Sequence, residues 1–94
     1  LLLFIYPDDK MSLTGDLSNE LLYKFPDKVI IVGRKKNDEV KMSIRSKNIV
    51  IRPILDKALV GLEGYGGGHE LACGANIKEI DFKEFIKRIK ENIV

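Results

Sequence analysis

Short apolar runs, separated by polar and turn-forming residues, recur along this chain and predict the strands of a small sheet. Residues 1–6 and 28–33 are almost continuously apolar, which suits strands covered on both faces. The sequence Pro-Asp-Asp-Lys at 7–10 is typical of a turn and ends the first run. Further stretches with the length and composition of strands lie at residues 11–14, 49–52 and 72–77.

Residues 40–46 differ from these runs, because apolar and polar side chains alternate one by one. Alternate side chains of a strand point to opposite faces. One face would enter the core, whereas the other would display Lys41, Ser43 and Arg45 in a row. A polar hairpin loop at 34–39 precedes this strand. We expect the polar face to be exposed and Arg45 to have no role in folding.

Helical spacing of apolar residues predicts two helices in the first two thirds of the chain. Thr14 or Asp16 can cap the first, which ends at Pro26. Pro53 suits the first turn of the second helix. Gly64 follows its last apolar residue and would close it.

The last helix has the clearest start signal, because Asp81 and Glu84 form a capping box. Its apolar stripe consists of Phe82, Phe85, Ile86, Ile89 and Ile93. The predicted element order is therefore β-α-β-β-α-β-α. This order implies an α/β fold, a single small domain with a mixed sheet of about four to five strands and helices packed on it.

Composition narrows the class of protein further. The 94 residues make one domain, and 45% apolar with 32% charged residues is typical of a soluble globular protein. No apolar run reaches the roughly 18 residues of a membrane span. A single cysteine excludes an internal disulfide and fits a reducing compartment. We therefore expect a cytoplasmic protein with no membrane partner, and the initial Leu1 suggests a piece cut from a longer chain.

The net charge of +2 is unevenly distributed. Residues 34–52 contain seven basic and two acidic residues, so this segment carries +5 and the rest of the chain −3. Such a cluster is either a solvated face or a surface that attracts polyanions.

The residue types of a hydrolase site are largely missing. A zinc site needs about four Cys, His or carboxylate ligands, and His69 and Cys73 are the only soft candidates. Cys73 fits a packed strand better than a nucleophile paired with His69. Asp8 and Asp9 lie in a proline turn with no histidine nearby, which favours a surface turn over a metal site. We expect no catalytic residue, no metal ligand and no cofactor in this chain.

The segment 64–77 holds five of the eight glycines and the only histidine. Gly66, Gly67 and Gly68 lack a Cβ, so their backbone can adopt φ > 0 and approach a ligand closely. Successive N–H groups in such a turn can form a nest for an anion. His69 follows at once and can donate a hydrogen bond to phosphate. The alternative is an ordinary loop with a histidine that merely packs, because a short glycine run alone is weak support for a site.

Residues 66–75, Gly-Gly-Gly-His-Glu-Leu-Ala-Cys-Gly-Ala, resemble the Gly-Gly-Gly-His-x-x-Ala-Ala-Gly-Ala signature of the DHHA1 domain. This is the C-terminal domain of DHH-family phosphoesterases, which include RecJ-type single-strand exonucleases and oligoribonucleases. Residues 43–46 resemble its Ser-x-Arg-Ser strand, and residues 12–17 are similar to its opening helix in archaeal RecJ-like proteins. The resemblance spans nearly all of residues 1–94. Cys73 departs from it, because Ala is usual there.

The resemblance implies that this chain is the substrate-binding half of a manganese- or magnesium-dependent phosphodiesterase. An N-terminal DHH domain would hold the metal ions, and no Asp-His-His motif occurs here. This half would bind single-stranded nucleic acid or a short oligonucleotide and present a phosphodiester to those metals. Carried over to this sequence, the contacts to phosphate or the terminal nucleotide fall on Gly66, Gly67, Gly68, His69, Arg45, Ser43 and Ser46.

The same domain type also occurs at the C-terminus of alanyl-tRNA synthetases, where it resembles a tRNA-binding and dimerisation module. That resemblance leaves open a tRNA-linked role and a homodimer, and a stand-alone structural module is a third reading. The histidine that follows the glycines favours the phosphoesterase branch.

Overall fold

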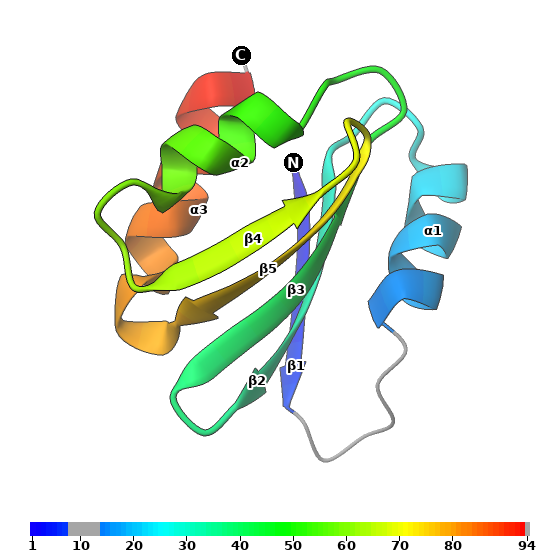
Figure 1. Ribbon diagram of the computed structural model, residues 1–94. Helices are drawn as coiled ribbons and strands as arrows, with labels where there is room; N and C mark the ends of the chain where they lie inside the picture. Colours follow the sequence, from blue (N-terminus) through cyan, green and yellow to red (C-terminus); the bar gives the residue numbers. More distant parts are fainter. Residues whose placement is uncertain (8–13, 94) are drawn as a thin grey trace.

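A five-stranded mixed sheet organises the protein, with helices on both of its faces (Figure 1). The computed structural model describes residues 1–7 and 14–93. The elements in chain order are β1 (Leu2–Pro7), α1 (Thr14–Lys24), β2 (Ile30–Lys36), β3 (Glu39–Arg45), α2 (Arg52–Leu59), β4 (Gly64–Gly68), β5 (Ala72–Lys78), the 3-10 turn η1 (Glu79–Asp81) and α3 (Phe82–Ile93).

The strands lie in the order β1-β2-β3-β5-β4. β1 and β2 are parallel, whereas the other three neighbouring pairs are antiparallel. The expected α/β architecture, a mixed sheet with helices packed on it, is confirmed. Among the described residues none of the helices is long and apolar enough to span a membrane.

Helices α2 and α3 pack together on one face of the sheet and enclose the main core (Figure 1). On this face Ile44 of β3 lies opposite Cys73 of β5, and Val40 lies opposite Ile77. All four side chains are buried, as is Phe85 of α3. The alternation along β3 therefore assigns its apolar side chains to the core as predicted.

Helix α1 covers the other face only in part, over β2 and β3. Ile30 and Val32 of β2 are fully buried, which explains why that strand is apolar on both sides. The hydroxyl of Ser43 lies beneath α1, where its Oγ is 2.9 Å from the buried Oγ of Ser18. The expectation that the polar side of residues 40–46 is exposed is thus wrong at Ser43, because a helix packs on it.

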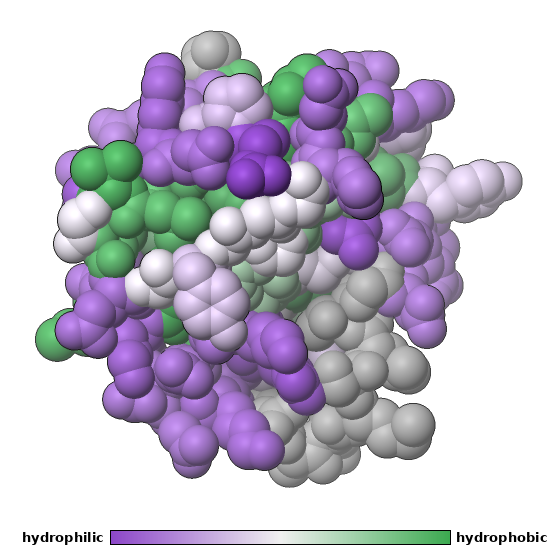
Figure 2. Space-filling view, viewed as in Figure 1, coloured by the Kyte–Doolittle hydropathy of each residue, from purple (hydrophilic) through white to green (hydrophobic). Residues whose placement is uncertain are grey.

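The glycine stretch is a strand, not the expected loop. Residues 64–68 form β4, the edge strand, and each of them pairs with a residue of β5. Because glycines carry no side-chain alternation, the periodicity of the sequence contains no sign of this strand. In the view of Figure 2, a pale strip of near-neutral residues follows β4, and hydrophilic side chains gather over the β2–β3 hairpin.

The second helix starts as expected but ends differently, and the predicted cap of the last helix has another role. The helix of Pro53 starts at Arg52, as its proline predicts. It ends at Leu59, and the glycine with φ of +76° that follows it is Gly61, not Gly64. The carboxylate of Asp81 accepts a hydrogen bond from the N–H of Glu63 at 3.0 Å, so it ties η1 to the start of β4.

Smaller corrections concern the connections. Residues 49–51 are not a strand, and the β2–β3 hairpin turns tightly at Asn37, whose φ is +57°. The predicted turn at 7–10 and the predicted strand at 11–14 lie largely outside the described residues, and Thr14 is helical.

Candidate nucleic-acid interface

The turn between β4 and β5, residues 69–71, carries the only histidine and is anchored through its backbone. The N–H of His69 donates to the carbonyl of Ala72 at 2.9 Å. The N–H groups of Ser46 and Ile51 donate to Leu71 and Glu70 at 3.0 and 2.7 Å. The His69 side chain is exposed. A fixed backbone therefore presents a solvent-facing imidazole at one end of the sheet, which we call the hairpin end (residues 67–73).

Two guanidinium groups are bound to this hairpin end. Arg45 donates from Nη1 to the carbonyl of Cys73 at 3.1 Å, and Arg52 donates from Nη1 to the carbonyl of Gly68 at 2.8 Å. Gly68 and Cys73 are cross-strand partners. The two arginines therefore hold the two strands of the hairpin where its turn begins, and they place positive charge beside His69.

Arg45 is more embedded in the fold than its sequence predicts. Its Nη1 also donates to the carbonyl of Ile44 at 3.0 Å, and its Nε donates to Asn19 Oδ1 of α1 at 3.1 Å. The expectation that Arg45 has no structural role is therefore wrong. Within the described part of the chain, Nη2 of Arg45 and Nη2 of Arg52 donate no hydrogen bond, so each retains N–H groups for a ligand.

The two serines of the candidate set face inward. Ser43 is 6% exposed and hydrogen-bonded to Ser18, and Ser46 is 4% exposed. The Oγ of Ser46 accepts a hydrogen bond from the N–H of Ile49 at 2.9 Å. Both hydroxyls thus support the end of β3 and its following turn, and neither reaches the surface that Arg45 shares with His69.

The three glycines of the signature have three different environments. A Cβ at Gly66 would lie 2.9 Å from the carbonyl oxygen of Gly74 and 3.2 Å from Leu55 Cδ2 of α2. Gly68 has φ of +138°, which side chains rarely tolerate. A Cβ at Gly67 would meet no atom of a described residue within 4 Å. The expected φ > 0 is therefore found only at Gly68, and Gly67 is the glycine that the fold itself does not require.

Cys73 is inert in this arrangement. Its side chain is 2% exposed, and its Sγ donates to the carbonyl of His69 at 3.0 Å. Burial raises the pKa of the thiol, and the nearby charges of Arg52 and Arg45 offset only part of this effect. A protonated thiol is a weak nucleophile. Among residues 1–7 and 14–93, no three His, Cys, Asp or Glu side chains gather to hold a metal ion.

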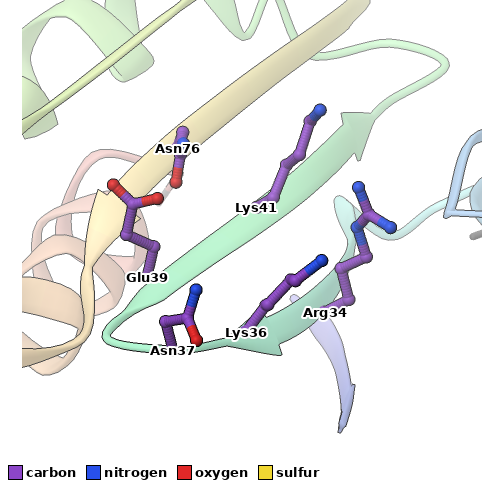
Figure 3. A pocket seen from close by; sticks show the side chains of 6 residues that line it. All are labelled: Arg34, Lys36, Asn37, Glu39, Lys41 and Asn76. Carbon is purple, nitrogen blue, oxygen red and sulfur yellow. The ribbon is translucent and has the colours of Figure 1, made fainter. Parts of the chain in front are cut away.

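A basic hollow of about 220 Å³ lies on the sheet face that α1 leaves uncovered. Its lining residues are Arg34, Lys36, Asn37, Glu39, Lys41 and Asn76. Figure 3 shows Lys41 between Arg34 on β2 and Asn76 on β5, with the basic side chains on the same side of the sheet. The positive charge of residues 34–52 signalled this surface, but no sequence pattern singled out Asn76 here or Arg52 at the hairpin end.

The strand order, the helices on both faces and the Gly-Gly-Gly-His hairpin together define a small α/β domain of the DHHA1 type. The DHHA1 domain family matches residues 3–94, and the chain belongs to this family.

Among solved structures, the chain is similar to the C-Ala domain of alanyl-tRNA synthetase from Aquifex aeolicus, with a TM-score of 0.77 and 19% identity over 96% of this chain and 86% of that one. It is also similar to RecJ from Thermus thermophilus in complex with Mn²⁺, with a TM-score of 0.75 and 21% identity over 96% of this chain. For the same RecJ in complex with Mg²⁺, the TM-score is 0.71 and the identity is 21% over 95% of this chain. This chain spans only 13–14% of RecJ. No curated protein sequence matches it.

Proposed function

We propose that this domain binds single-stranded nucleic acid at its hairpin end and presents a phosphodiester to the metal centre of a DHH domain. In this proposal Arg45, Arg52 and His69 contact phosphate, and the backbone at Gly67 and Gly68 lets the strand approach closely. Ser43 and Ser46 hold the strand that carries Arg45. The metal ligands and the hydrolytic chemistry belong to the DHH domain, outside this chain.

One observation carries the proposal: two guanidinium groups are fixed on the carbonyls of a single cross-strand pair, beside an exposed histidine. Hydrogen bonds that hold a side chain in place reduce the entropy lost when it binds a ligand. Guanidinium groups are suited to phosphate because they remain charged and can donate two parallel hydrogen bonds. A pair of them at a hairpin end is therefore a preorganised phosphate site.

The family membership supports the same role, because the DHHA1 fold is also found within RecJ, a structure that was solved with Mn²⁺. The local charge supports it as well. Residues 34–52 carry +5 and include both arginines, so the anionic backbone of a strand is attracted to this side of the protein.

The test is a fluorescence-anisotropy titration of a short labelled strand, as DNA and as RNA, at several salt concentrations. Arg52→Ala should weaken binding by about 1.5–3 kcal/mol, the range for a hydrogen bond to a charged group. It should also flatten the log–log salt dependence by about 0.7, which corresponds to one phosphate contact. Lys57→Ala removes the same charge from an exposed position of α2 and should change neither quantity appreciably.

Equal losses in Arg52→Ala and Lys57→Ala would reduce the effect to overall charge and contradict the proposal. Thermal melts of each variant verify that the hairpin end remains folded. A folded tRNA serves as the competing probe. If tRNA binds more than tenfold more tightly than an unstructured strand of equal length, the tRNA-linked role becomes the better account.

A further inference from the structure

We infer that the uncovered sheet face beside the hairpin end is a second contact zone, where a nucleobase stacks on Tyr65 and a phosphate binds Lys41. The domain would then prefer oligonucleotides over dinucleotides. This inference rests on the proposed function, because the zone continues the path of a strand held at the hairpin end. It adds residues and a substrate length that the DHHA1 signature does not specify.

Four side chains form a row across four adjacent strands. Arg34 of β2 pairs with Lys41 of β3, Lys41 pairs with Asn76 of β5, and Asn76 pairs with Tyr65 of β4. Directly paired residues of antiparallel strands point to the same face. With neighbouring strands about 4.8 Å apart, the row crosses about 14 Å of the sheet.

Tyr65 offers a free aromatic surface at the end of this row. It is 70% exposed, so most of the ring surface is available to a ligand, and aromatic rings prefer stacked arrangements. Beside its direct partner Asn76, the next positions on the same face toward the hairpin end are Gly67 and Gly74, which form a cross-strand pair. A Cβ at Gly74 would be no closer than 3.6 Å to another atom, and one at Gly67 would meet no atom of a described residue within 4 Å. The sheet face therefore carries no side chain at Gly67 and Gly74, next to an exposed ring. A flat base stacked on Tyr65 needs this free space for its edge.

A hollow of about 200 Å³ lies over this part of the sheet face, next to Tyr65. It is lined by Lys41, Met42, Tyr65, Gly66, Gly67, Gly74, Ala75 and Asn76. The basic hollow of Figure 3 adjoins it, because Lys41 and Asn76 line both. The two hollows therefore form one surface that combines an aromatic ring, an amide and a cation.

Two polar side chains of this surface, Lys41 and Asn76, have unused bonding capacity. Lys41 is exposed and makes no ion pair with any described residue. Asn76 Oδ1 is buried without a hydrogen-bond partner in the described chain, and Asn76 Nδ2 has only a long contact of 3.5 Å to the Tyr65 hydroxyl. Glu39 is the one acidic side chain among the described residues that line the basic hollow, and it is paired with Lys78 at 3.6 Å. A ligand that brings a donor and an anion would satisfy Asn76 and Lys41 together.

The zone is placed to receive the same strand as the hairpin end. Lys41 and Arg45 lie on one face of β3, four residues and therefore about 14 Å apart. Gly67 lies between Tyr65 and His69 along β4 and the turn that follows. A dinucleotide held by the arginines and His69 would not extend to Tyr65, whereas a longer strand would pass over Gly67 to reach it.

The experiment compares a dinucleotide with an oligonucleotide of about eight residues, within the range of single-strand site sizes. Wild type should bind the longer strand at least tenfold more tightly. Tyr65→Ala should weaken binding of the longer strand by about tenfold, the order of one base–aromatic stack, and leave the dinucleotide unchanged. Tyr65→Phe should retain the longer-strand affinity and Tyr65→Leu should not, because stacking requires the ring. Lys41→Ala should also act only on the longer strand, with Lys57→Ala as its charge-matched control.

Two results would overturn the inference while leaving the proposed function intact. In the first, Arg52→Ala loses binding, but Tyr65→Ala and Lys41→Ala bind both lengths like wild type. In the second, Tyr65→Ala changes the sedimentation coefficient of the free protein, which would make this face a contact between copies of the chain. If wild type binds neither length, the proposed function fails instead.

Discussion

Gly66 and Gly67 are adjacent in β4, yet the structure gives them opposite reasons to be glycine. Gly66 faces α2, where its missing Cβ lets Leu55 and the β5 backbone pack closely. Gly67 faces open space on the sheet face that α1 leaves uncovered. A glycine in a strand costs conformational entropy without contributing packing. The fold therefore explains Gly66, whereas a ligand is the better explanation for Gly67.

The pair provides a matched test by valine substitution. Gly66→Val should lower the free energy of unfolding by about 1–3 kcal/mol, because the side chain overpacks a filled space. Gly67→Val should leave stability unchanged or raise it by up to about 1 kcal/mol, since valine is favoured in strands. It should nevertheless abolish binding of a single strand. Urea melts and anisotropy measure both properties, and unimpaired binding by Gly67→Val would show that Gly67 is not part of the site.

Arg45 has a structural role in the fold in addition to its proposed role in binding, so its replacement should have two effects. Arg45→Ala removes the donor to the carbonyls of Ile44 and Cys73. We expect the free energy of unfolding to fall by about 1.5–3 kcal/mol, together with weaker strand binding. Asn19→Ala removes only the partner of Nε and should cost about 0.5–1.5 kcal/mol, with little loss of binding. Arg45→Ala with wild-type stability would show that its hydrogen bonds contribute nothing to folding.

Strand β5 connects the core to the site, because its alternate residues face opposite sides. Cys73, Ala75 and Ile77 are buried beneath α2 and α3, whereas Gly74 and Asn76 face the uncovered side of the sheet. The carbonyl of Cys73 also holds Arg45. Packing on one face of β5 therefore fixes the geometry of the proposed binding groups on the other.

The buried thiol of Cys73 makes the free energy of unfolding depend on pH, so the packing of this face of β5 can be tested by a pH series. Burial raises the pKa of Cys73 above its ordinary value of 9.0, so the unfolded chain loses its thiol proton before the folded protein does. The contribution of this thiol to the free energy of unfolding should therefore be constant below about pH 8 and fall as the pH rises through about 9. Lys78 has a raised pKa too, chiefly through the charge of Asp38, so the difference between wild type and Cys73→Ala isolates the thiol. Parallel pH profiles for the two proteins would contradict the burial of Cys73.

At the scale of the whole molecule, the hydrophobic pattern is informative where side chains alternate and uninformative where they are missing. It predicted the α/β class and the faces of β3, because burial follows the period of each element. β4 was not predicted, because three of its residues are consecutive glycines. Two features depend on contacts between segments 16 to 28 residues apart. One is the position of α1 over Ser43, and the other is the set of hydrogen bonds from Arg45 and Arg52 to the hairpin end. No local pattern encodes such contacts.

In the candidate site too, some features follow from the local sequence and others from tertiary contacts. The signature selected Gly67 and His69, and the roles proposed for them depend only on local backbone and exposure. Ser43 and Ser46 belong to the Ser-x-Arg-Ser strand of the same family resemblance, yet their hydroxyls are used inside the fold. Arg52 lies at the start of α2, outside the residues that the resemblance selected, and it reaches Gly68 only through the tertiary fold.

The most direct test of the binding surface is an amide chemical-shift titration of the ¹⁵N-labelled protein with a short single strand. The account predicts that the shifts concentrate at residues 67–73, at Arg45 and Arg52, and along the row that contains Lys41, Tyr65 and Asn76. The opposite side serves as an internal reference, because the apolar groove between Leu3 and α3 also carries lysines: Lys83, Lys87 and Lys90. Shifts confined to that groove, with the hairpin end unperturbed, would contradict the account.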